Sequence, residues 1–249
     1  MLIEYTKSSF LDHPIAMLKF AAGQKDPLHA IMLERTAKIL LGKNFQPKIA
    51  AAALSEIQRG DFVPMNQLPG VNLPGNKPRH LFGKFLYFIV RCAQPDVMVE
   101  TGVAHGVSSW TILNAMHRNK KGKLYSIDLP NQDLRSYNPE NIAQSSGWVV
   151  PDELRARWEL RLGPSQELLP RLVKELSKID VFFHDSDHSY ENMLFEFQTV
   201  APAIQEGGLI ISDDVHKNDA FRDFISGDPY TGVQFFTKGG AAVKIGNYE

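Results

Sequence analysis

Acidic residues and a histidine directly follow two apolar runs in the second half of the chain. Asp185 and His188 come after the first run, and Asp213 and Asp214 come after the second. If both runs are strands of one parallel sheet, their carboxyl ends meet at the edge where open sheets bind ligands. Three carboxylates at one edge repel each other unless a positive charge lies between them. A hard divalent cation such as Mg²⁺, Mn²⁺ or Ca²⁺ prefers oxygen ligands and would supply that charge.

The same residues have a simpler interpretation. Asp185 can cap the helix expected to begin near Ser189, and the acidic pair can cap the next short helix. Asp187 is expected to be such a cap, or to support the metal ligands. His188 can take a proton from a substrate at neutral pH, because its unperturbed pKa is near 6.5, or it can be a polar loop residue.

Three other histidines and the single cysteine lie near these segments. His216 follows the acidic pair and can orient a substrate or support the metal ligands. His184 ends an apolar run and is expected to pack in the core. His105 lies in a glycine-containing loop, where its side chain can contact a ligand or lie at the protein surface. Cys92 falls in an apolar helix and is expected to be a small buried hydrophobe rather than a nucleophile.

A glycine-containing loop at residues 99–110 (VETGVAHGVSSW) links an apolar run to a helical pattern. Gly102 and Gly106 allow a tight turn and a close approach to a ligand, and the helix start offers free N–H groups. Ser108 or Ser109 can cap the helix or contact the ligand. The G-x-x-x-G spacing matches neither the dinucleotide fingerprint nor the phosphate loop. A plain strand-to-helix turn remains the alternative.

The next apolar run ends at Asp128. A carboxylate there can accept hydrogen bonds from both ribose hydroxyls of a nucleoside-type ligand, or it can be a solvated loop residue. With Glu100 and the glycine loop, it resembles the motifs of the class I S-adenosylmethionine-dependent methyltransferases. The resemblance covers roughly residues 80–249, although Ala104 replaces a glycine that is common in the family. It implies that the methionine part and the ribose of the cofactor are held by these residues.

Later segments extend the resemblance. Residues 158–170 (WELRLGPSQELLP) are similar to the strand and turn near adenine in catechol O-methyltransferase-like members, with Gly163, Ser165 and Gln166 at the adenine. Ser165 can also be the N-cap of the following helix. The full set of cofactor-binding residues that the resemblance implies is Glu100, Gly102, Gly106, Ser108, Asp128, Gly163, Ser165 and Asp185.

The acidic cluster resembles that of the metal-dependent O-methyltransferases of the catechol and macrolide-sugar types. The resemblance implies a divalent cation, Mg²⁺ above all, held by Asp185, Asp213 and Asp214. It also implies that His188, three residues after the first of these, is the catalytic base. A hydroxyl bound to the cation becomes more acidic, a base takes its proton, and the oxygen attacks the sulfonium methyl in line.

The predicted function is therefore S-adenosylmethionine-dependent and divalent-metal-dependent O-methylation of a small molecule, such as a sugar, a phenol or another secondary metabolite. Two alternatives stay open. His188, His216 and one aspartate could form an iron site of the two-histidine, one-carboxylate type in a hydroxylase-like enzyme. The chain could also be a non-catalytic cofactor-binding protein on the same fold.

Alternating apolar runs and amphipathic patterns must position these residues. The runs expected as strands lie at residues 96–100, 123–127, 158–162, 179–183 and 209–212. The clearest helical stripe runs from Tyr190 to Ile204. This alternation predicts an α/β fold, Rossmann-like, with a mostly parallel sheet covered by helices on both faces. Residues 232–237 and 241–246, around a turn at 238–240, predict a C-terminal antiparallel hairpin.

Two regions lie outside this core pattern. Residues 1–80 are expected to form a helical N-terminal cap with a Pro- and Gly-rich loop, and residues 81–249 the methyltransferase domain. The polar stretch at 129–150 is longer than a usual connection. There Tyr137 and Trp148 can line an acceptor pocket or anchor the loop.

Composition limits the function classes. The chain has 249 residues and is 43% hydrophobic, and its 27 Lys and Arg against 28 Asp and Glu give a net charge of −1. This balance argues against a nucleic-acid or membrane partner, and one cysteine excludes a disulfide framework. With no apolar run of membrane length and no signal-like N-terminus, we expect a cytoplasmic protein with a small-molecule acceptor, assembled as a homo-oligomer.

Overall fold

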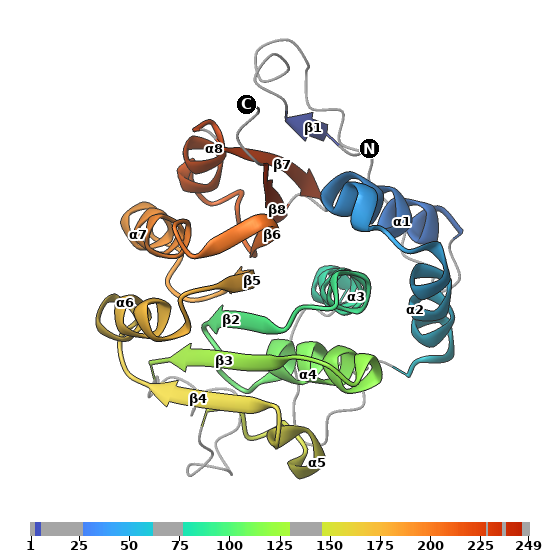
Figure 1. The fold of residues 1–249 in the computed structure, drawn as a ribbon, viewed down its shortest axis with the longest axis horizontal. Coiled ribbons are helices and arrows are strands. Elements are labelled where there is room, and N and C mark those ends of the chain that lie inside the picture. The colour runs from blue at the N-terminus through green and yellow to red at the C-terminus, as the bar shows by residue number, and fades with distance from the viewer. Residues whose placement is uncertain are drawn as a thin grey trace.

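A single eight-stranded sheet forms the centre of the protein (Figure 1), with the strand order β1-β7-β8-β6-β5-β2-β3-β4. The computed structural model describes residues 3–5, 27–61, 77–129, 146–227, 229–235 and 238–245. The strands are β1 (Ile3–Tyr5), β2 (Val97–Thr101), β3 (Lys123–Asp128), β4 (Trp158–Leu162), β5 (Ile179–His184), β6 (Ile204–Ser212), β7 (Tyr230–Phe235) and β8 (Gly239–Lys244). All five predicted parallel strands are present within a few residues of their expected bounds.

The sheet is parallel from β6 to β4 and antiparallel at its other side. This confirms the predicted mixed sheet and C-terminal hairpin. The predicted turn at 238–240 is wrong in part, because Gly239 and Gly240 belong to β8. Gly240 pairs with Ser212, and a Cβ on it would lie 2.6 Å from the ring of Phe221. The glycine is needed there for close packing rather than for a turn.

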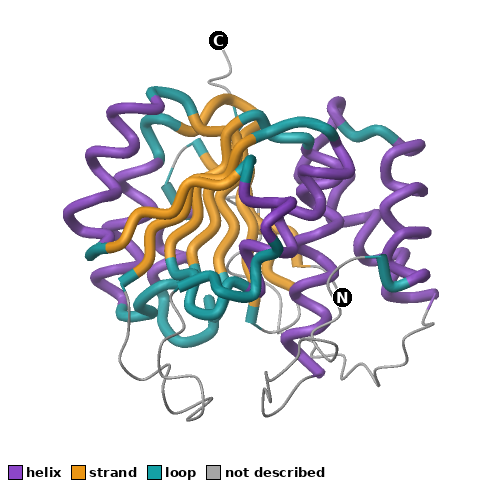
Figure 2. The backbone as a smooth tube through the Cα atoms, turned by 90° about the horizontal axis from the view of Figure 1, so that it is seen from below, coloured by secondary structure: helices purple, strands orange, loops and turns teal. Residues whose placement is uncertain are grey.

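Helices cover both faces of the sheet (Figure 2). They are α1 (Pro27–Leu41), the short 3₁₀ helix η1 (Gly42–Asn44), α2 (Pro47–Arg59), α3 (Lys77–Ala93), α4 (Val107–Asn119), α5 (Asp152–Arg155), α6 (Ser165–Leu176), α7 (Tyr190–Val200) and α8 (Ala220–Ile225). Helices α6, α7 and α8 lie on one face, and α3 and α4 lie on the other, with α1 and α2 outside α3 (Figure 1). Within the described residues, no helix combines the length and apolar character needed to cross a membrane.

The helical stripe after β5 is shorter than predicted. Helix α7 ends at Val200, and Ile204 is the first residue of β6. Pro202 lies between them and has no N–H to donate, so the helix stops before it. The apolar spacing from Tyr190 to Ile204 therefore continues across two different elements.

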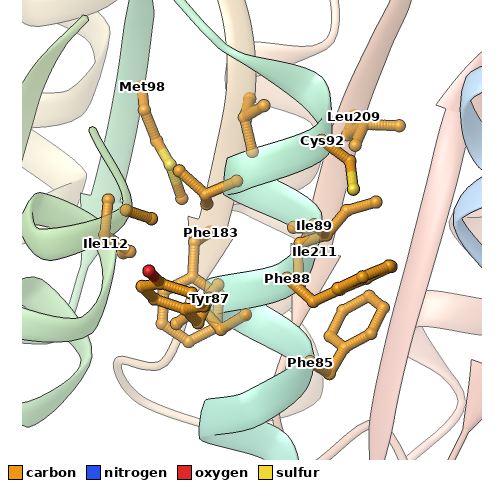
Figure 3. Packing of buried hydrophobic residues seen from close by; sticks show 14 of the residues in the cluster. Phe85, Tyr87, Phe88, Ile89, Cys92, Met98, Ile112, Phe183, Leu209 and Ile211 are labelled. Carbon is orange, nitrogen blue, oxygen red and sulfur yellow. The ribbon is translucent and has the colours of Figure 1, made fainter. Parts of the chain in front are cut away.

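Helix α3 is the centre of the larger hydrophobic cluster (Figure 3). Its side chains Phe85, Tyr87 and Phe88 are essentially buried, and the cluster extends to Phe183 of β5 and to α1 and α2. The predicted division at residues 80 and 81 falls inside this helix. The N-terminal helices thus share one core with the sheet, as a cap would.

Cys92 also lies in this cluster and is 3% exposed. Burial raises the pKa of its thiol to about 12. The thiol therefore stays protonated at neutral pH, which confirms the prediction of a small buried hydrophobe.

A buried ion pair joins the cap to α3. Glu56 of α2 accepts hydrogen bonds from Arg91 Nε and Nη2, at 2.8 and 2.9 Å, and from the hydroxyl of Tyr87 at 2.8 Å. Both charged side chains are 9% exposed. Removing one partner of such a pair leaves the other charge buried without compensation.

We expect Glu56→Ala to lower the free energy of unfolding by about 3–5 kcal/mol, because Arg91 would lose its buried counter-charge. Urea denaturation measures this loss. Glu34→Ala is the matched control: it removes the exposed pair of Glu34 with Lys38 in α1 and should cost about 0.5 kcal/mol or less. Equal losses in the two variants would contradict a structural role for the buried pair.

Candidate active site

A cavity of about 360 Å³ opens at the carboxyl ends of the parallel strands. The loop between β2 and α4 lines one side, and the segments that follow β5 and β6 line another. Helix α3 adds an apolar wall through Phe82 and Leu86. This is the sheet edge at which open α/β folds bind ligands. The predicted residues that line it are His105, Ser108, Asp185, His188, Asp213 and Asp214.

Two glycines bring the walls of this site together. A Cβ on Gly102, at φ +84°, would lie 2.1 Å from the backbone oxygen of Asp185. A Cβ on Gly106, at φ +94°, would lie 2.6 Å from the Cα of Gly147. Neither position tolerates a side chain. Both glycines thus allow neighbouring loops to pack against the loop between β2 and α4, and neither lines the cavity.

Glu100 lies beneath this loop rather than in the cavity. It is fully buried and accepts hydrogen bonds from the hydroxyls of Ser108, Ser109 and Ser126, at 2.6 to 2.7 Å. Burial raises the pKa of Glu100 to about 6, although the three hydroxyls oppose that shift. Ser108 links this carboxylate to the cavity wall, while Glu100 itself supports the loop from below.

Asp128 holds the same loop from the end of β3. Its Oδ1 accepts hydrogen bonds from the backbone N–H groups of Val103 and Ala104, at 2.8 and 3.2 Å. Its Oδ2 accepts one from the hydroxyl of Ser146. The side chain is buried. Asp128 therefore couples the glycine loop to the segment that contains Ser146.

The segment predicted to lie near adenine follows β4. Gly163 precedes α6, and the N-cap of that helix is Pro164, so the prediction of Ser165 as N-cap is wrong. Ser165 is the first residue of the helix, and its side chain hydrogen-bonds Glu196. Gln166 donates a hydrogen bond to Asn192 Oδ1 at 2.6 Å. These contacts tie α6 to α7, outside the cavity.

Two histidines, His105 and His188, line the cavity, and His188 is the one beside Asp185. Its side chain is 14% exposed, and its Nε2 lies 3.7 Å from Oδ1 of Asp185. This nitrogen has no hydrogen-bond partner among the described residues. Burial, with the neighbouring His184 and Lys217, lowers the pKa of His188 to about 4. The imidazole is therefore neutral at pH 7 and can accept a proton.

Asp214 is already paired with two cationic side chains. Lys217 Nζ lies 2.7 Å from its Oδ2, and Lys238 Nζ lies 3.2 Å from its Oδ1. Burial opposes the charge, but the two lysines hold the pKa of Asp214 below its usual range. Within the described ranges, no group of three His, Cys, Asp or Glu side chains is close enough to hold a metal ion. Lysines thus supply positive charge beside the acidic pair.

The proposed capping roles are wrong for all three cavity aspartates. The N-cap of α7 is Ser189, whose hydroxyl accepts from Asn192 N, and the N-cap of α8 is Asp219. Asp187 is exposed and accepts hydrogen bonds from the N–H and hydroxyl of Ser189. It therefore stabilises the turn before α7.

His105 lines the cavity, as one of its two predicted positions requires, and the other predicted aromatic and histidine residues that the structure describes lie around it. His184 is fully buried, which confirms the core prediction. The rings of His105 and Trp148 meet edge to face at 6.1 Å, so Trp148 anchors its segment against the glycine loop. His216 lies 3.7 Å from Asp214 Oδ1 but does not line the cavity. Tyr137 lies outside the described residues.

Sequence reasoning missed several residues of the site. Lys217 follows Asp214 by three residues, a spacing that is typical of a local ion pair. Lys238 comes from the C-terminal hairpin, and no sequence pattern near Asp214 indicates that it pairs with this residue. Glu196 was missed although it lies on the apolar stripe of α7, between Met193 and Val200. A carboxylate on a buried helical face indicates a buried polar network.

Comparisons with known proteins identify a family and several solved structures that this chain resembles. A family described as a methyltransferase domain matches residues 99–215. Residues 99–215, just under half of the chain, are therefore assigned to a methyltransferase domain. The match spans the glycine loop, Asp128 and the acidic residues after β5 and β6, so the family resemblance is confirmed over these segments.

Individual relatives are more distant. A catechol O-methyltransferase of Niastella koreensis is 24% identical over 163 residues, which are 65% of this chain and 66%, just under two thirds, of the relative. The O-methyltransferase TomG of Streptomyces achromogenes, solved with S-adenosylmethionine, superposes with a TM-score of 0.53 at 18% identity, over 81% of this chain and 91% of TomG. An O-methyltransferase of Bacillus cereus, solved with SAH, superposes with a TM-score of 0.50 at 16% identity. The superposition covers 86% of this chain and 97% of the Bacillus cereus protein. These structures share the Rossmann-like fold of the methyltransferase.

The lowered pKa of His188 makes stability depend on pH. Its pKa is about 4 in the folded chain and near 6.5 when unfolded, so the unfolded state binds more protons between these values. The wild type should lose about 2 kcal/mol of unfolding free energy between pH 7.5 and pH 5.0 from this residue. His188→Gln should remove that part of the loss, as measured by urea denaturation at both pH values. An equal loss in both proteins would contradict the shift.

Proposed function

We propose that this methyltransferase transfers the methyl group of S-adenosylmethionine to a hydroxyl group of a small molecule such as a sugar or a phenol. The observation that carries the proposal is the position of His188. Its neutral imidazole lines the same cavity as the glycine loop and three aspartates. The cited O-methyltransferase relatives support oxygen as the acceptor atom.

The residues of the chain fit the proposed cofactor. Asp128 fixes the glycine loop, because its carboxylate accepts hydrogen bonds from the N–H groups of Val103 and Ala104. Ser108, residues 103–105 and Asp185 all line the cavity. A cationic sulfonium beside Asp185 would be stabilised by the carboxylate charge. We therefore assign the methionine end of the cofactor to the space between Ser108 and Asp185.

Within this site, His188 removes the proton of the acceptor hydroxyl through Nε2. Burial keeps the imidazole neutral, so Nε2 accepts the proton in the tautomer that carries its hydrogen on Nδ1, and Asp185, 3.7 Å away, stabilises the imidazolium that forms. Phe82 and Leu86 exclude water and hold the apolar part of the acceptor. S-adenosylmethionine, when bound, would supply an electrophilic methyl carbon to this oxygen, and its sulfur would leave as a neutral thioether.

A divalent cation is a further part of the proposal. Asp185, Asp213 and Asp214 line one cavity, and carboxylates are the ligands that Mg²⁺ prefers. Both oxygens of Asp214 lie close to lysines, so this residue would join the ligand set only after it releases Lys217 or Lys238. When bound, such a cation would make a coordinated hydroxyl more acidic. An iron site that includes His188 and His216 has less support, because His216 does not line the cavity.

Removal of the proposed base should reduce turnover without weakening cofactor binding. We expect His188→Gln to lower kcat by about 100-fold or more, because proton removal is lost. The dissociation constant for S-adenosylmethionine should stay within about threefold. Transfer of a labelled methyl group to a panel of phenols and sugars measures the first, and calorimetry measures the second. Tight cofactor binding by the wild type without transfer to any acceptor would favour a non-catalytic binding protein.

The cation and the lysines should compete for Asp214. We expect Lys238→Gln to tighten Mn²⁺ binding by about tenfold, because one positive charge beside the carboxylates is removed. Asp185→Asn should weaken it by a similar factor. Calorimetric titration with Mn²⁺ measures both effects. Full methyl transfer by an EDTA-treated sample, with no Mn²⁺ binding in any variant, would exclude the cation and leave His188 as the base.

A further inference from the structure

Behind the cavity, a fully buried carboxylate collects hydrogen bonds from three elements, β2, β5 and α6, and from the loop between β5 and α7. Glu196 of α7 is 0% exposed and accepts from Thr101 Oγ1 at 2.5 Å and Ser186 Oγ at 2.8 Å. His184 Nδ1 lies 2.7 Å from its Oε2, and Ser165 also reaches it. Burial alone would raise the pKa of Glu196, but these hydrogen bonds hold it below its usual value. The group is therefore an ionised carboxylate inside the core.

His184 shares a hydrogen bond with this carboxylate through only one of its two ring nitrogens. An ionised carboxylate only accepts hydrogen bonds, so Nδ1 of His184 carries the hydrogen of their shared bond. His184 Nε2 is buried and has no hydrogen-bond partner among the described residues. A buried polar atom without a partner costs stability, so its presence calls for an explanation.

The ring of His184 separates the buried carboxylate from His188. The two histidine rings meet edge to face, with centroids 5.2 Å apart and an interplanar angle of 76°. The ring of His184 also packs against that of Phe197, with centroids 5.5 Å apart and an interplanar angle of 70°. With Nδ1 held by Glu196 and the ring packed against Phe197, His184 has one orientation. Asn218 also holds the backbone oxygen of His188, at 2.9 Å.

We propose that Glu196 and His184 are positioning residues for His188. The carboxylate fixes the ring of His184, and that ring keeps the imidazole of His188 at the cavity wall with Nε2 beside Asp185. This inference rests on the proposed function, in which His188 takes the proton of the acceptor. It assigns a role to two buried polar residues that touch neither the cofactor space nor the acceptor space.

The direct test is Glu196→Gln, which keeps the side-chain shape but removes the charge and replaces one acceptor oxygen by a donor. We expect kcat to fall by about tenfold or more, as for other changes in groups that orient a reacting residue. The KM for the acceptor and the dissociation constant for S-adenosylmethionine should stay within about twofold. The imidazole ¹⁵N signals of His188 should shift, and those of His184 should report Nδ1 as the protonated nitrogen in the wild type.

Glu56→Gln is the matched control. It makes the same substitution in another buried carboxylate, in α2, which bonds Arg91 and Tyr87 away from the cavity. It should lower Tm but leave kcat and the His188 signals unchanged. Wild-type kcat in Glu196→Gln, or an equal loss of kcat in Glu56→Gln, would overturn the proposal.

A second variant covers the case in which Glu196→Gln does not fold. The double substitution His184→Phe with Glu196→Leu removes both polar partners together and leaves no buried charge unpaired. It should fold, bind S-adenosylmethionine and show a reduced kcat like that of Glu196→Gln, and wild-type kcat would again overturn the positioning role. In the same assay, a wild-type kcat in His188→Gln would reject His188 as the base. A reduced kcat in His188→Gln together with a wild-type kcat in the double variant would reject only the positioning role of Glu196 and His184.

Discussion

The site depends on one close backbone contact between two neighbouring parallel strands. At the end of β2, Gly102 packs directly on the backbone of Asp185, and Asp185 N donates to Thr101 O at 2.8 Å. Only a glycine fits this approach, because a Cβ would lie 2.1 Å from the Asp185 oxygen. The contact fixes the glycine loop against the segment that carries Asp185 and His188. The two walls of the cavity therefore have a set separation before any ligand binds.

Charge compensation is the second constraint. Four acidic groups lie at or just below this sheet edge, and each has its own donors. Hydroxyl groups surround Glu100, backbone N–H groups hold Asp128, and lysines pair with Asp214. Glu196 is held from β2, β5, α6 and the loop that follows β5. Because these charges are satisfied within the protein, the cavity can present Asp185 and His188 to a ligand without leaving buried carboxylates unpaired.

The order of strands and helices could be predicted because it depends on local patterns. The apolar runs that became β2 to β6 are short and bounded by polar residues, and their alternation with helical patterns is typical of a parallel sheet. Periodicity failed where the chain changed element without changing its apolar spacing, as between α7 and Ile204. Residue type failed as a guide to helix capping at Ser165. The hydroxyl of this residue hydrogen-bonds the buried carboxylate of Glu196 in α7 instead.

The fold class, the sheet edge that carries the candidate site, and the residue types gathered there, among them Asp185, His188 and Asp128, follow from local sequence patterns. Residue type and distance from a strand end are local properties, so spacing predicted that these residues lie at this edge, and their roles in binding and catalysis stay predictions. The partner that each side chain takes depends instead on how the whole chain packs. Lys238 reaches Asp214 across 24 residues, and Thr101 reaches Glu196 across 95. Such contacts are set by the packing of strands and helices that are distant in the chain, and no local pattern encodes them.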